Sequence, residues 1–336
     1  MIYRKGAIGA TAVLLAIAAC GTGGQQGSGS GATCDNFTLA ALDDDSHRTA
    51  YYAIDRGHVT SDVIGKLDVE YMQIPALIQA TGSGQYDVVA TSLPGLVQAR
   101  EKGKVDLRIV GLIQAQTGGG TKTYVRADSP IKTGKDLKGK TVGVTGFGSS
   151  VTMTAQLVYT EKYGLNSKQE GGDVNYVELD PQTLLNALEK GDVDAAVLFH
   201  QAGWRASKDG KFRVAAAVDQ DFRELGDAWL VGAALVTEAD VLAEKAACVT
   251  EFQRMIRESV AYAEANVASF AGDISKETGV DPEFIKYWWN GESYRFGGTT
   301  DAEWVGWAKA FYTIAQRNGY LPVNPDLNAI VVKDRS

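Results

Sequence analysis

Apolar runs of strand length alternate with stretches of helical period along most of the chain, and one such phrase occurs twice. The first copy, residues 68–92, is predicted as strand, short helix and strand, and residues 173–199 have the same order. Two pairs of side chains keep their places in the phrase, Tyr71 with Tyr176 and Asp87 with Asp194. Strands that alternate with helices are typical of parallel sheets covered by helices on both faces. The repeat therefore predicts an α/β protein with two similar, Rossmann-like lobes.

Further strands flank the two copies. A strand, a polar loop and a helix precede each copy, over residues 38–57 and 141–164. Two extended runs, 107–113 and 123–126, lie between the copies, and a third, 229–237, follows the second copy. We interpret these runs as the strands by which the chain leaves the first lobe and returns to it. Two crossings make a two-strand hinge, about which lobes can close on a ligand.

The crossings divide the body of the chain. We expect the first lobe to hold residues 36–125 and 235–336, and the second lobe to hold residues 126–234. The C-terminal part of the first lobe is helical by period at 239–264 and 301–318 and has no counterpart in the repeat. Apolar stripes at helical spacing are more often core than ligand contacts. These helices are therefore expected to pack rather than to bind.

The N-terminus has the pattern of an export signal. Arg4 and Lys5 precede an apolar run over residues 7–19, which is too short to span a bilayer stably. The run ends in Ile-Ala-Ala-Cys at Cys20, which resembles the lipobox of bacterial lipoproteins. In that motif the cysteine becomes the lipid-modified first residue of the mature chain. We therefore predict a signal peptide over residues 1–19, with ordinary cleavage and an uncleaved anchor as the alternatives.

The lipid predicted at Cys20, a palmitate-type acyl anchor, would hold the exported protein on the outer face of the cytoplasmic membrane, with a periplasmic location as the alternative. Residues 20–35 are rich in glycine and serine. Such sequence behaves as flexible coil. It is therefore expected to tether a folded body to the membrane.

Composition narrows the partners of the body. The formal charge of −8 becomes more negative once Arg4 and Lys5 leave with the signal, which argues against nucleic acid. The apolar and charged fractions are ordinary for a globular protein. With Cys20 assigned to lipid, Cys34 and Cys248 remain in an oxidising compartment, where a pair of cysteines is typical of a disulfide. Two separate thiols, with Cys248 on an apolar helix face, are the alternative.

Four polar loops are predicted at the carboxyl ends of strands, where open parallel sheets bind their ligands. They comprise residues 43–48, 91–93, 146–150 and 199–201. The residues expected to contact a ligand are Asp44, Ser46, His47, Thr91, Ser92, Phe147, Gly148, Ser149, Ser150, His200, Gln201 and Trp229.

The loop at 146–150 suits an anionic group. Its small residues let the backbone approach a ligand, and Ser149 or Ser150 can cap the following helix while free N–H groups face the cleft. A plain helix cap without a ligand is equally consistent with this sequence. No Gly-Lys-Ser/Thr follows the loop and Gly-x-Ser-x-Gly is absent, so the signatures of nucleotide hydrolysis and acyl transfer are missing. We predict no catalytic residue.

The three aspartates at 43–45 have two interpretations. They form a solvated turn in which one of them caps a helix. Alternatively, one carboxylate receives a cationic or hydroxyl group of the ligand while Ser149 holds the other end, as a zwitterion such as taurine would require.

Histidine and aromatic side chains add weaker indications. His47 and His200 with an aspartate could bind a metal ion, but no His-x-His or Cys-x-x-Cys spacing supports this. We predict neither a metal nor a cofactor. Phe147 or Trp229 can stack on a flat part of a ligand. The pair Trp288-Trp289 either lines the cleft rim or covers the core of the first lobe, and we favour the core.

Two phrases resemble the solute-binding proteins of ABC importers. They are Ala-Asp-Ser-Pro-Ile-Lys-Thr-Gly-Lys-Asp-Leu-Lys-Gly-Lys-Thr-Val-Gly-Val, residues 127–144, and Tyr-Tyr-Ala-Ile-Asp-Arg-Gly, residues 51–57. With the matching loops, they resemble the nitrate, sulfonate and taurine group of these proteins, which is NMT1/THI5-like. The resemblance covers roughly residues 38–320.

The resemblance implies a type II periplasmic-binding-protein fold, a monomer that captures a small molecule by lobe closure, and delivery to a membrane permease driven by an ATPase. The expected ligand is a small organic anion or zwitterion of the aliphatic sulfonate, taurine or nitrate kind. The family's binding loops fall on Ser46 and His47, on Thr91 and Ser92, on residues 148–150, and on His200 and Gln201. The aspartates at 43–45 depart from a simple sulfonate site.

Two other functions remain open. THI5-like enzymes of pyrimidine metabolism share this fold, and fold does not fix function. The cysteine-rich cluster of those enzymes is missing here, and an export signal removes the chain from cytoplasmic biosynthesis. The body could instead serve as a ligand-sensing domain for a membrane partner.

Overall fold

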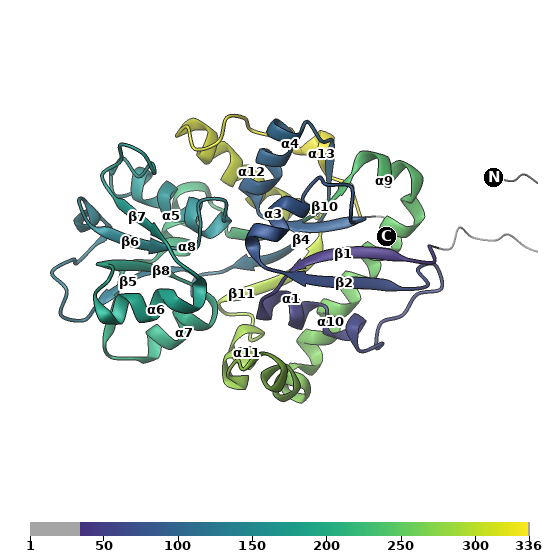
Figure 1. Cartoon of the computed structure of the whole chain (residues 1–336), viewed down its shortest axis with the longest axis horizontal. Coiled ribbons are helices and arrows are strands. Elements are labelled where there is room, and N and C mark those ends of the chain that lie inside the picture. The colour runs from purple at the N-terminus through teal and green to yellow at the C-terminus, as the bar shows by residue number, and fades with distance from the viewer. Residues whose placement is uncertain (1–33, 335–336) are drawn as a thin grey trace, which may run out of the picture. The chain divides into compact units, whose positions relative to one another are not determined.

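The computed structural model describes residues 34–334 as a mixed α/β body with two sheets (Figure 1). The predicted signal peptide, the lipid site Cys20 and residues 20–33 of the predicted tether lie outside the described residues. Cys34 already belongs to the body, because it forms a parallel bridge with Ile64. No helix among residues 34–334 combines the length and the apolar character that crossing a bilayer requires.

The first sheet has six strands in the order β11-β4-β10-β3-β1-β2. Strand β1 runs parallel to β2 and β3, whereas β10 is antiparallel to both β3 and β4. Its strands are β1 (Phe37–Leu42), β2 (Leu67–Met72), β3 (Val88–Thr91), β4 (Leu107–Gln116), β10 (Leu230–Glu238) and β11 (Tyr294–Thr299).

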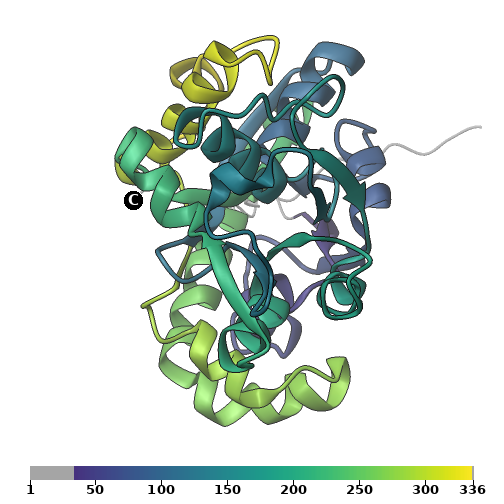
Figure 2. The same ribbon diagram turned by 90° about the vertical axis from the view of Figure 1, so that its left-hand side faces the viewer.

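The second sheet has five strands in the order β7-β6-β8-β5-β9. Figure 2 shows this sheet and its helices from their outer side. Here β6 runs parallel to β7 and β8, and β5 is antiparallel to β8 and β9. The strands are β5 (Lys122–Arg126), β6 (Thr141–Val144), β7 (Asn175–Glu178), β8 (Ala195–Leu198) and β9 (Phe212–Ala216).

Helices connect and cover the strands. Those that precede β10 are α1 (Asp45–Ala50), α2 (Tyr52–Asp55), α3 (Ile74–Ala80), α4 (Leu93–Gly103), the 3-10 turn η1 (Gly134–Leu137), α5 (Ser150–Glu161), α6 (Pro181–Lys190), α7 (His200–Lys208) and α8 (Val218–Gly226). Those that follow β10 are α9 (Ala239–Glu244), α10 (Ala246–Thr278), α11 (Pro282–Trp288), α12 (Ala302–Arg317) and α13 (Leu327–Ile330).

The internal repeat is visible in both the topology and the hydrogen bonds. The strand orders β2-β1-β3 and β7-β6-β8 are equivalent, and all these pairs are parallel. Asp87 accepts a hydrogen bond from the backbone N–H of Thr38 at 2.9 Å, and Asp194 accepts one from Thr141 at 2.9 Å. Thr38 and Thr141 lie near the starts of the equivalent strands β1 and β6. The predicted α/β fold with two lobes and two crossings is confirmed.

The crossings lie at slightly different residues than the sequence indicates. The chain passes between the sheets at 117–121 and at 227–229. Strand β5, which we placed at the end of the first lobe, pairs in the five-stranded sheet, and all of β10 pairs in the six-stranded sheet. Local hydropathy marks a strand but does not show with which sheet it pairs. The exact lobe limits stay a prediction.

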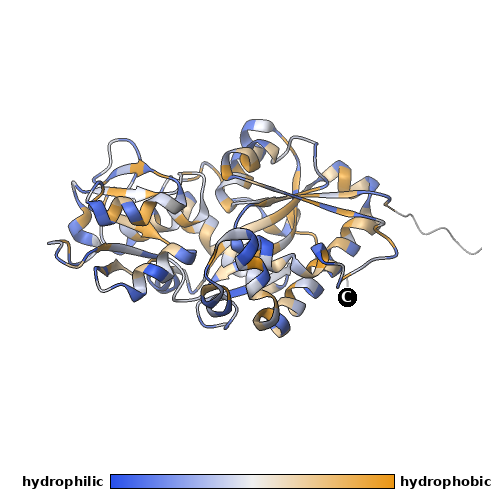
Figure 3. Cartoon of the chain, turned by 60° about the horizontal axis from the view of Figure 1, so that its bottom comes forward, coloured by the Kyte–Doolittle hydropathy of each residue, from blue (hydrophilic) through white to orange (hydrophobic). Residues whose placement is uncertain are grey.

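The long C-terminal helices form core, as expected. Figure 3 shows apolar residues gathered along the strands and the inward faces of the helices. Trp288 is fully buried, Trp289 is nearly so, and Trp304 and Phe311 of α12 are buried as well. The interpretation of the Trp288-Trp289 pair as core is confirmed.

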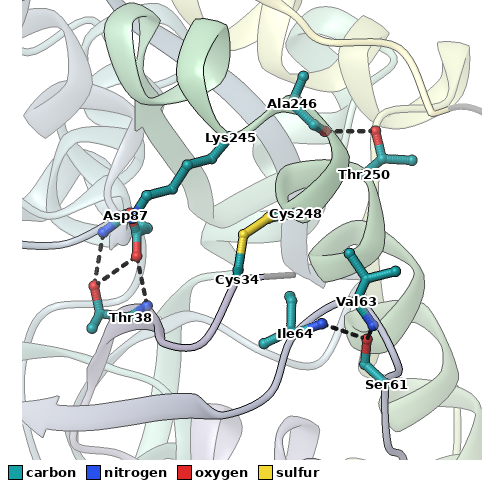
Figure 4. Close-up of a disulfide and its surroundings, with 10 residues drawn as sticks. All are labelled: Cys34, Thr38, Ser61, Val63, Ile64, Asp87, Lys245, Ala246, Cys248 and Thr250. Carbon is teal, nitrogen blue, oxygen red and sulfur yellow. Dashed lines mark hydrogen bonds and ion pairs between the residues drawn. A yellow bond between two sulfur atoms is a disulfide. The ribbon is translucent and has the colours of Figure 1, made fainter. Parts of the chain in front are cut away.

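A disulfide joins Cys34, just before β1, to Cys248 of α10, with Cα atoms 6.3 Å apart (Figure 4). Close to it, Lys245 forms an ion pair of 2.6 Å with Asp87, the same carboxylate that binds Thr38 (Figure 4). The start of the body is therefore fixed to the C-terminal helices both covalently and by charge.

Candidate functional site

A cavity of about 930 Å³ lies between the two sheets, where their parallel strands end. Residues 43–45 follow β1 and residues 73–75 follow β2, while Thr145 follows β6 and residues 179–181 follow β7. Residues 199–202, after β8, complete the second lobe's side. This is the position at which open α/β sheets bind ligands.

Carboxylates dominate the charge of the cavity wall. They are Asp43, Asp44, Asp45, Glu178, Asp180 and Glu277. The arginines among the described lining residues are Arg48 and Arg205. Arg48 pairs with Asp43 at 2.8 Å, and Glu277 pairs with Arg56 outside the cavity. The wall is therefore acidic after these pairs are taken into account.

Asp44 is held as a carboxylate at the first lobe's side of the cavity. Its Oδ1 accepts hydrogen bonds from the Ser46 hydroxyl at 2.5 Å, the His47 backbone N–H at 3.0 Å and His47 Nδ1 at 3.1 Å. His47 and His200 attract the charge and hold the pKa of Asp44 well below its usual range, although burial alone would raise it. One of the three aspartates is thus a helix cap, as the sequence indicated, because Asp44 caps α1.

His200 reaches Asp44 from the opposite lobe. Its Nδ1 lies 3.7 Å from Asp44 Oδ2, and its Nε2 lies 3.1 Å from the side-chain nitrogen of Gln114 on β4. An amide nitrogen donates, so Nε2 is the acceptor and Nδ1 carries the proton that faces Asp44. Burial lowers the pKa of His200 to about 4, against the attraction of Asp44.

The backbone of His200 has a φ of 50°. This left-handed conformation is uncommon outside glycine and occurs often at functional sites. Two groups hold it in place: the Tyr294 hydroxyl accepts from the His200 backbone N–H at 3.1 Å, and the Trp288 ring lies 4.6 Å from the imidazole. The fold therefore positions this side chain tightly at the cavity.

The serine loops are packed against each other rather than open to the cavity. The Ser92 hydroxyl donates to the Gly148 carbonyl at 2.6 Å, and the Leu93 backbone N–H donates to the Ser150 hydroxyl at 3.1 Å. Ser149 caps α5 by accepting from Val151 N–H. None of these residues is part of the described cavity wall, and neither is Thr91. Their contact with a ligand stays a prediction.

The other expected contacts divide in the same way. Gln201 lines the cavity beside His200, whereas Ser46 and His47 lie behind Asp44. Phe147 packs edge-on against Tyr176 outside the described wall, and Trp229 lies at the second crossing, under the guanidinium of Arg223. The structure thus brings Asp44, Ser46, His47, His200 and Gln201 together and places the other seven expected residues elsewhere.

Several wall residues were not predicted. Arg205 lies one helical turn beyond Gln201 on α7, and residues 277–280 approach from the end of α10. The period of α7 could have identified Arg205, since residues four apart share a helix face. No local signal places the end of α10 at this cavity, because that contact joins distant parts of the chain.

No group of three or more histidine, cysteine, aspartate or glutamate side chains within residues 34–334 is arranged to hold a metal ion. Asp44 does lie between His47 and His200, the set that the sequence offered for a metal. Its carboxylate accepts from His47 Nδ1 instead. The expected absence of a metal stays a prediction.

Two titrating groups of the cavity should change stability with pH in opposite directions. The unfolded chain protonates His200 near its ordinary pKa of 6.5 and the folded chain only near 4, so the free energy of unfolding falls as pH drops through this range. Burial, with repulsion from Asp44 and Asp43, raises the pKa of Asp45 from 3.8 to about 7, although Arg48 lowers it. The folded chain therefore binds this proton more tightly than the unfolded chain does. The free energy of unfolding that Asp45 contributes is lost as pH rises from about 4 to about 7.

In the native protein, we expect the pH dependences that His200 and Asp45 give to the free energy of unfolding to offset each other. Two variants, each lacking one of the groups, should reveal them separately. Relative to the native chain, His200→Asn should lose stability as pH rises from 4 towards 6.5, and Asp45→Asn should gain it. Each slope should be at most about 1.4 kcal/mol per pH unit, reduced by partial solvent access. Urea unfolding at several pH values measures this, and parallel curves for all three proteins would contradict it.

Comparisons with known proteins give the family and the fold. The sequence profile described as NMT1/THI5 like matches residues 46–267. Among curated proteins no sequence matches the chain. The periplasmic aliphatic sulphonate binding protein SsuA from Escherichia coli is 18% identical, with 90% of this chain and 94% of that chain covered and a TM-score of 0.69.

Two other solved structures show the range of proteins with this fold. The alkanesulfonate-binding protein SsuA from Xanthomonas axonopodis pv. citri, bound to MOPS, is 18% identical over 90% of this chain and 100% of that chain, with a TM-score of 0.66. The desulfurization enzyme DSZB is 15% identical over 89% and 97%, with a TM-score of 0.57. Because the family profile matches most of the chain and the solved structures share its architecture, this protein belongs to the NMT1/THI5-like family and has the periplasmic-binding-protein fold.

Proposed function

We propose that this protein is the extracytoplasmic substrate-binding protein of an ABC importer. It captures a small organic anion or zwitterion, of the aliphatic sulfonate kind, between its lobes and delivers it to a permease and its ATPase. A lipid at Cys20 anchors it to the outer face of the cytoplasmic membrane, and it acts as a monomer. The observation that carries the proposal is the cavity at the strand ends, where Asp44 of one lobe faces His200 of the other.

Capture by lobe closure is supported by the contacts between the lobes. Two chain crossings connect the sheets, and the loops around Ser92 and Ser150 meet through short hydrogen bonds. Such contacts can break when the lobes move apart, since each joins one loop to another. A lipid tether supports delivery, because it raises the effective concentration of the protein near the permease.

An enzyme is the alternative that a specific observation favours, because the desulfurization enzyme DSZB has the same fold. A sensor domain for a membrane partner is the other alternative. The two are separated from an importer by different results: product formation indicates an enzyme, whereas unchanged uptake after gene deletion indicates a sensor.

Binding without turnover is the direct test. The full chain, purified in detergent, is screened by thermal shift against alkanesulfonates, taurine, nitrate, aromatic carboxylates and pyrimidines. A ligand that binds only the folded state raises the melting temperature. Mass spectrometry of the incubated compounds should recover them unchanged. Conversion of any of them would reject the binding-protein proposal.

Ser150→Ala is expected to weaken the binding of a ligand found in this screen by about five- to tenfold, the cost of one hydrogen bond. The variant removes the acceptor of the Leu93 N–H, a buried hydrogen bond that joins the two lobes and that we expect to be lost when they move apart. Titration calorimetry measures the affinity. The variant Ser149→Ala, compared with it, removes a hydroxyl that bonds within its own loop; a loss of stability with affinity within about twofold would show that Ser149 acts only as a helix cap. Equal losses would instead mean that both hydroxyls meet the ligand.

A further inference from the structure

Each wall of the cavity carries one charged side chain that has no hydrogen-bond or ion-pair partner among residues 34–334, and the two are of opposite type. Among the described residues, no hydrogen bond or ion pair satisfies the carboxyl of Asp45 on the first lobe. On the second lobe, the exposed guanidinium of Arg205 also lacks a hydrogen-bond or ion-pair partner within residues 34–334. A carboxyl group and a guanidinium group are thus both available to a ligand, and a cationic nitrogen beside Asp45 would favour the ionised carboxylate.

Asp44 adds a second oxygen to the negative side. Three donors satisfy its Oδ1, whereas the nearest polar atom recorded for Oδ2 is His200 Nδ1 at 3.7 Å. That distance is longer than a hydrogen bond. The side chain of Asp44 is 19% exposed and lines the cavity, so Oδ2 can accept from a bound molecule.

Buried polar atoms around these groups also lack partners. Thr145 lines the cavity, and its hydroxyl is buried with no hydrogen bond among the described residues. His47 is 3% exposed and donates from Nδ1 to Asp44, which leaves its Nε2 without a partner in the described part of the chain. Native proteins pair nearly all buried polar atoms with protein, water or ligand. The Thr145 hydroxyl is therefore an unpaired polar atom at the cavity wall itself, whereas His47 Nε2 lies behind Asp44.

We infer that the ligand is a zwitterion, with a cationic nitrogen that binds Asp44 and Asp45 on the first lobe and an anionic group that binds Arg205 on the second. The inference rests on the proposed function and narrows its ligand class. It assigns specificity to the aspartates that depart from a simple sulfonate site. The ligand would draw the lobes together, because its two charges meet opposite walls.

Electrostatics disfavour a simple anion in this cavity. Burying a negative group beside Asp44, Asp45 and Asp43 costs free energy unless a positive group accompanies it. Arg48 does not supply that charge, because it is paired with Asp43 and lies 4.3 Å over the Tyr71 ring. An ammonium group attached to the anion supplies it.

Pairs of compounds that differ only in the charged nitrogen test the inference. The full chain in detergent is titrated with taurine and isethionate, with homotaurine and hydroxypropanesulfonate, and with aminomethylbenzoate and hydroxymethylbenzoate. Each pair keeps the anion and exchanges an ammonium group for a hydroxyl. For at least one pair we expect the amine to bind tenfold or more tightly than the hydroxyl compound, as the loss of a charge-assisted hydrogen bond predicts.

Two variants then locate the two ends of the bound amine. Asp45→Asn should weaken its binding by about tenfold to a hundredfold, and Arg205→Gln should do the same while an anion-free amine is unaffected. Asp45 has no partner to lose, so its variant should fold. Glu277→Gln is the matched control, since Glu277 lines the same cavity but is paired with Arg56, and it should change affinity by less than about threefold.

The outcomes separate this inference from the proposed function. Equal binding of both members of every pair that binds would overturn the zwitterion while leaving a solute-binding protein. Binding of another class from the thermal-shift screen, with none of the amines bound, would do the same. Unchanged affinity in Asp45→Asn would overturn the assigned contact. Conversion of a compound, or no binding by any compound of either screen, would reject the proposed function and the inference with it.

Discussion

Asp219→Ala is expected to lower the free energy of unfolding by about 3 kcal/mol or more, because it leaves several buried donors unpaired. Asp219 of α8 is fully buried, and its Oδ2 accepts from the backbone N–H groups of Gly118, Gly120 and Thr121 at 3.2, 2.7 and 3.3 Å. These residues form the first crossing between the sheets. One carboxylate thus binds the backbone of the first of the two crossings that form the hinge. Burial raises its pKa, while the N–H groups oppose that rise.

Urea unfolding of the native and variant proteins measures the loss. The free energy of unfolding of Asp219→Asn should lie between those of the native protein and Asp219→Ala. The amide oxygen can still accept from the N–H groups of the crossing. The amide NH₂, however, would face the N–H of Gln220, which in the native protein donates to Oδ1. Asp227→Asn is the control, since Asp227 lies at the second crossing with its side chain 95% exposed and a φ that asparagine tolerates. A loss in Asp219→Ala no larger than in this control would show that the carboxylate does not hold the hinge.

The sequence predicts the fold well because the same strand-helix-strand pattern of apolar and polar residues occurs in both lobes. Asp87 and Asp194 recur at equivalent places, and both bind the start of the neighbouring parallel strand. Strand-length apolar runs locate β1 and β6 within one residue, whereas the runs predicted at 85–92 and 192–199 start three residues before β3 and β8. By contrast, β11 was not predicted. Its two glycines at 297 and 298 interrupt the strand pattern. Its pairing partner β4 is also far away in the chain.

The candidate site was only partly predictable, for a related physical reason. Loops at strand ends are visible in the sequence, so Asp44, His200 and Gln201 were expected and do meet at the cavity. Whether such a loop faces a cavity or another loop depends on how the lobes pack. Ser150 is 2% exposed because the loop after β3 covers it. That packing depends on the whole fold, so the residues of the loop at 146–150 do not reveal it by themselves.

Cys34→Ser is expected to lower the free energy of unfolding by about 4 kcal/mol, because the lost disulfide closes a long loop. The bond joins residues separated by 214 positions, so its loss frees most of the body in the unfolded chain. In the folded state it fixes the segment before β1 to α10 (Figure 4). Cys34 is the better site for the change than Cys248, because Cys248 is 2% exposed and a hydroxyl there would be buried.

Thermal unfolding with and without reductant isolates the contribution of the bond. Reductant should lower the melting temperature of the native protein to that of Cys34→Ser and leave the variant unchanged. The double variant Cys34→Ser/Cys248→Ser tests additivity. Its free energy of unfolding should be lower than that of Cys34→Ser only by the small cost of the buried hydroxyl, because the same disulfide is absent from both variants. Two free thiols in the oxidised native protein, counted by alkylation and mass spectrometry, would show that the pair is unbonded. The stabilisation of this end of the body would then have to come from Lys245 and Asp87, whose ion pair of 2.6 Å lies beside the cysteines.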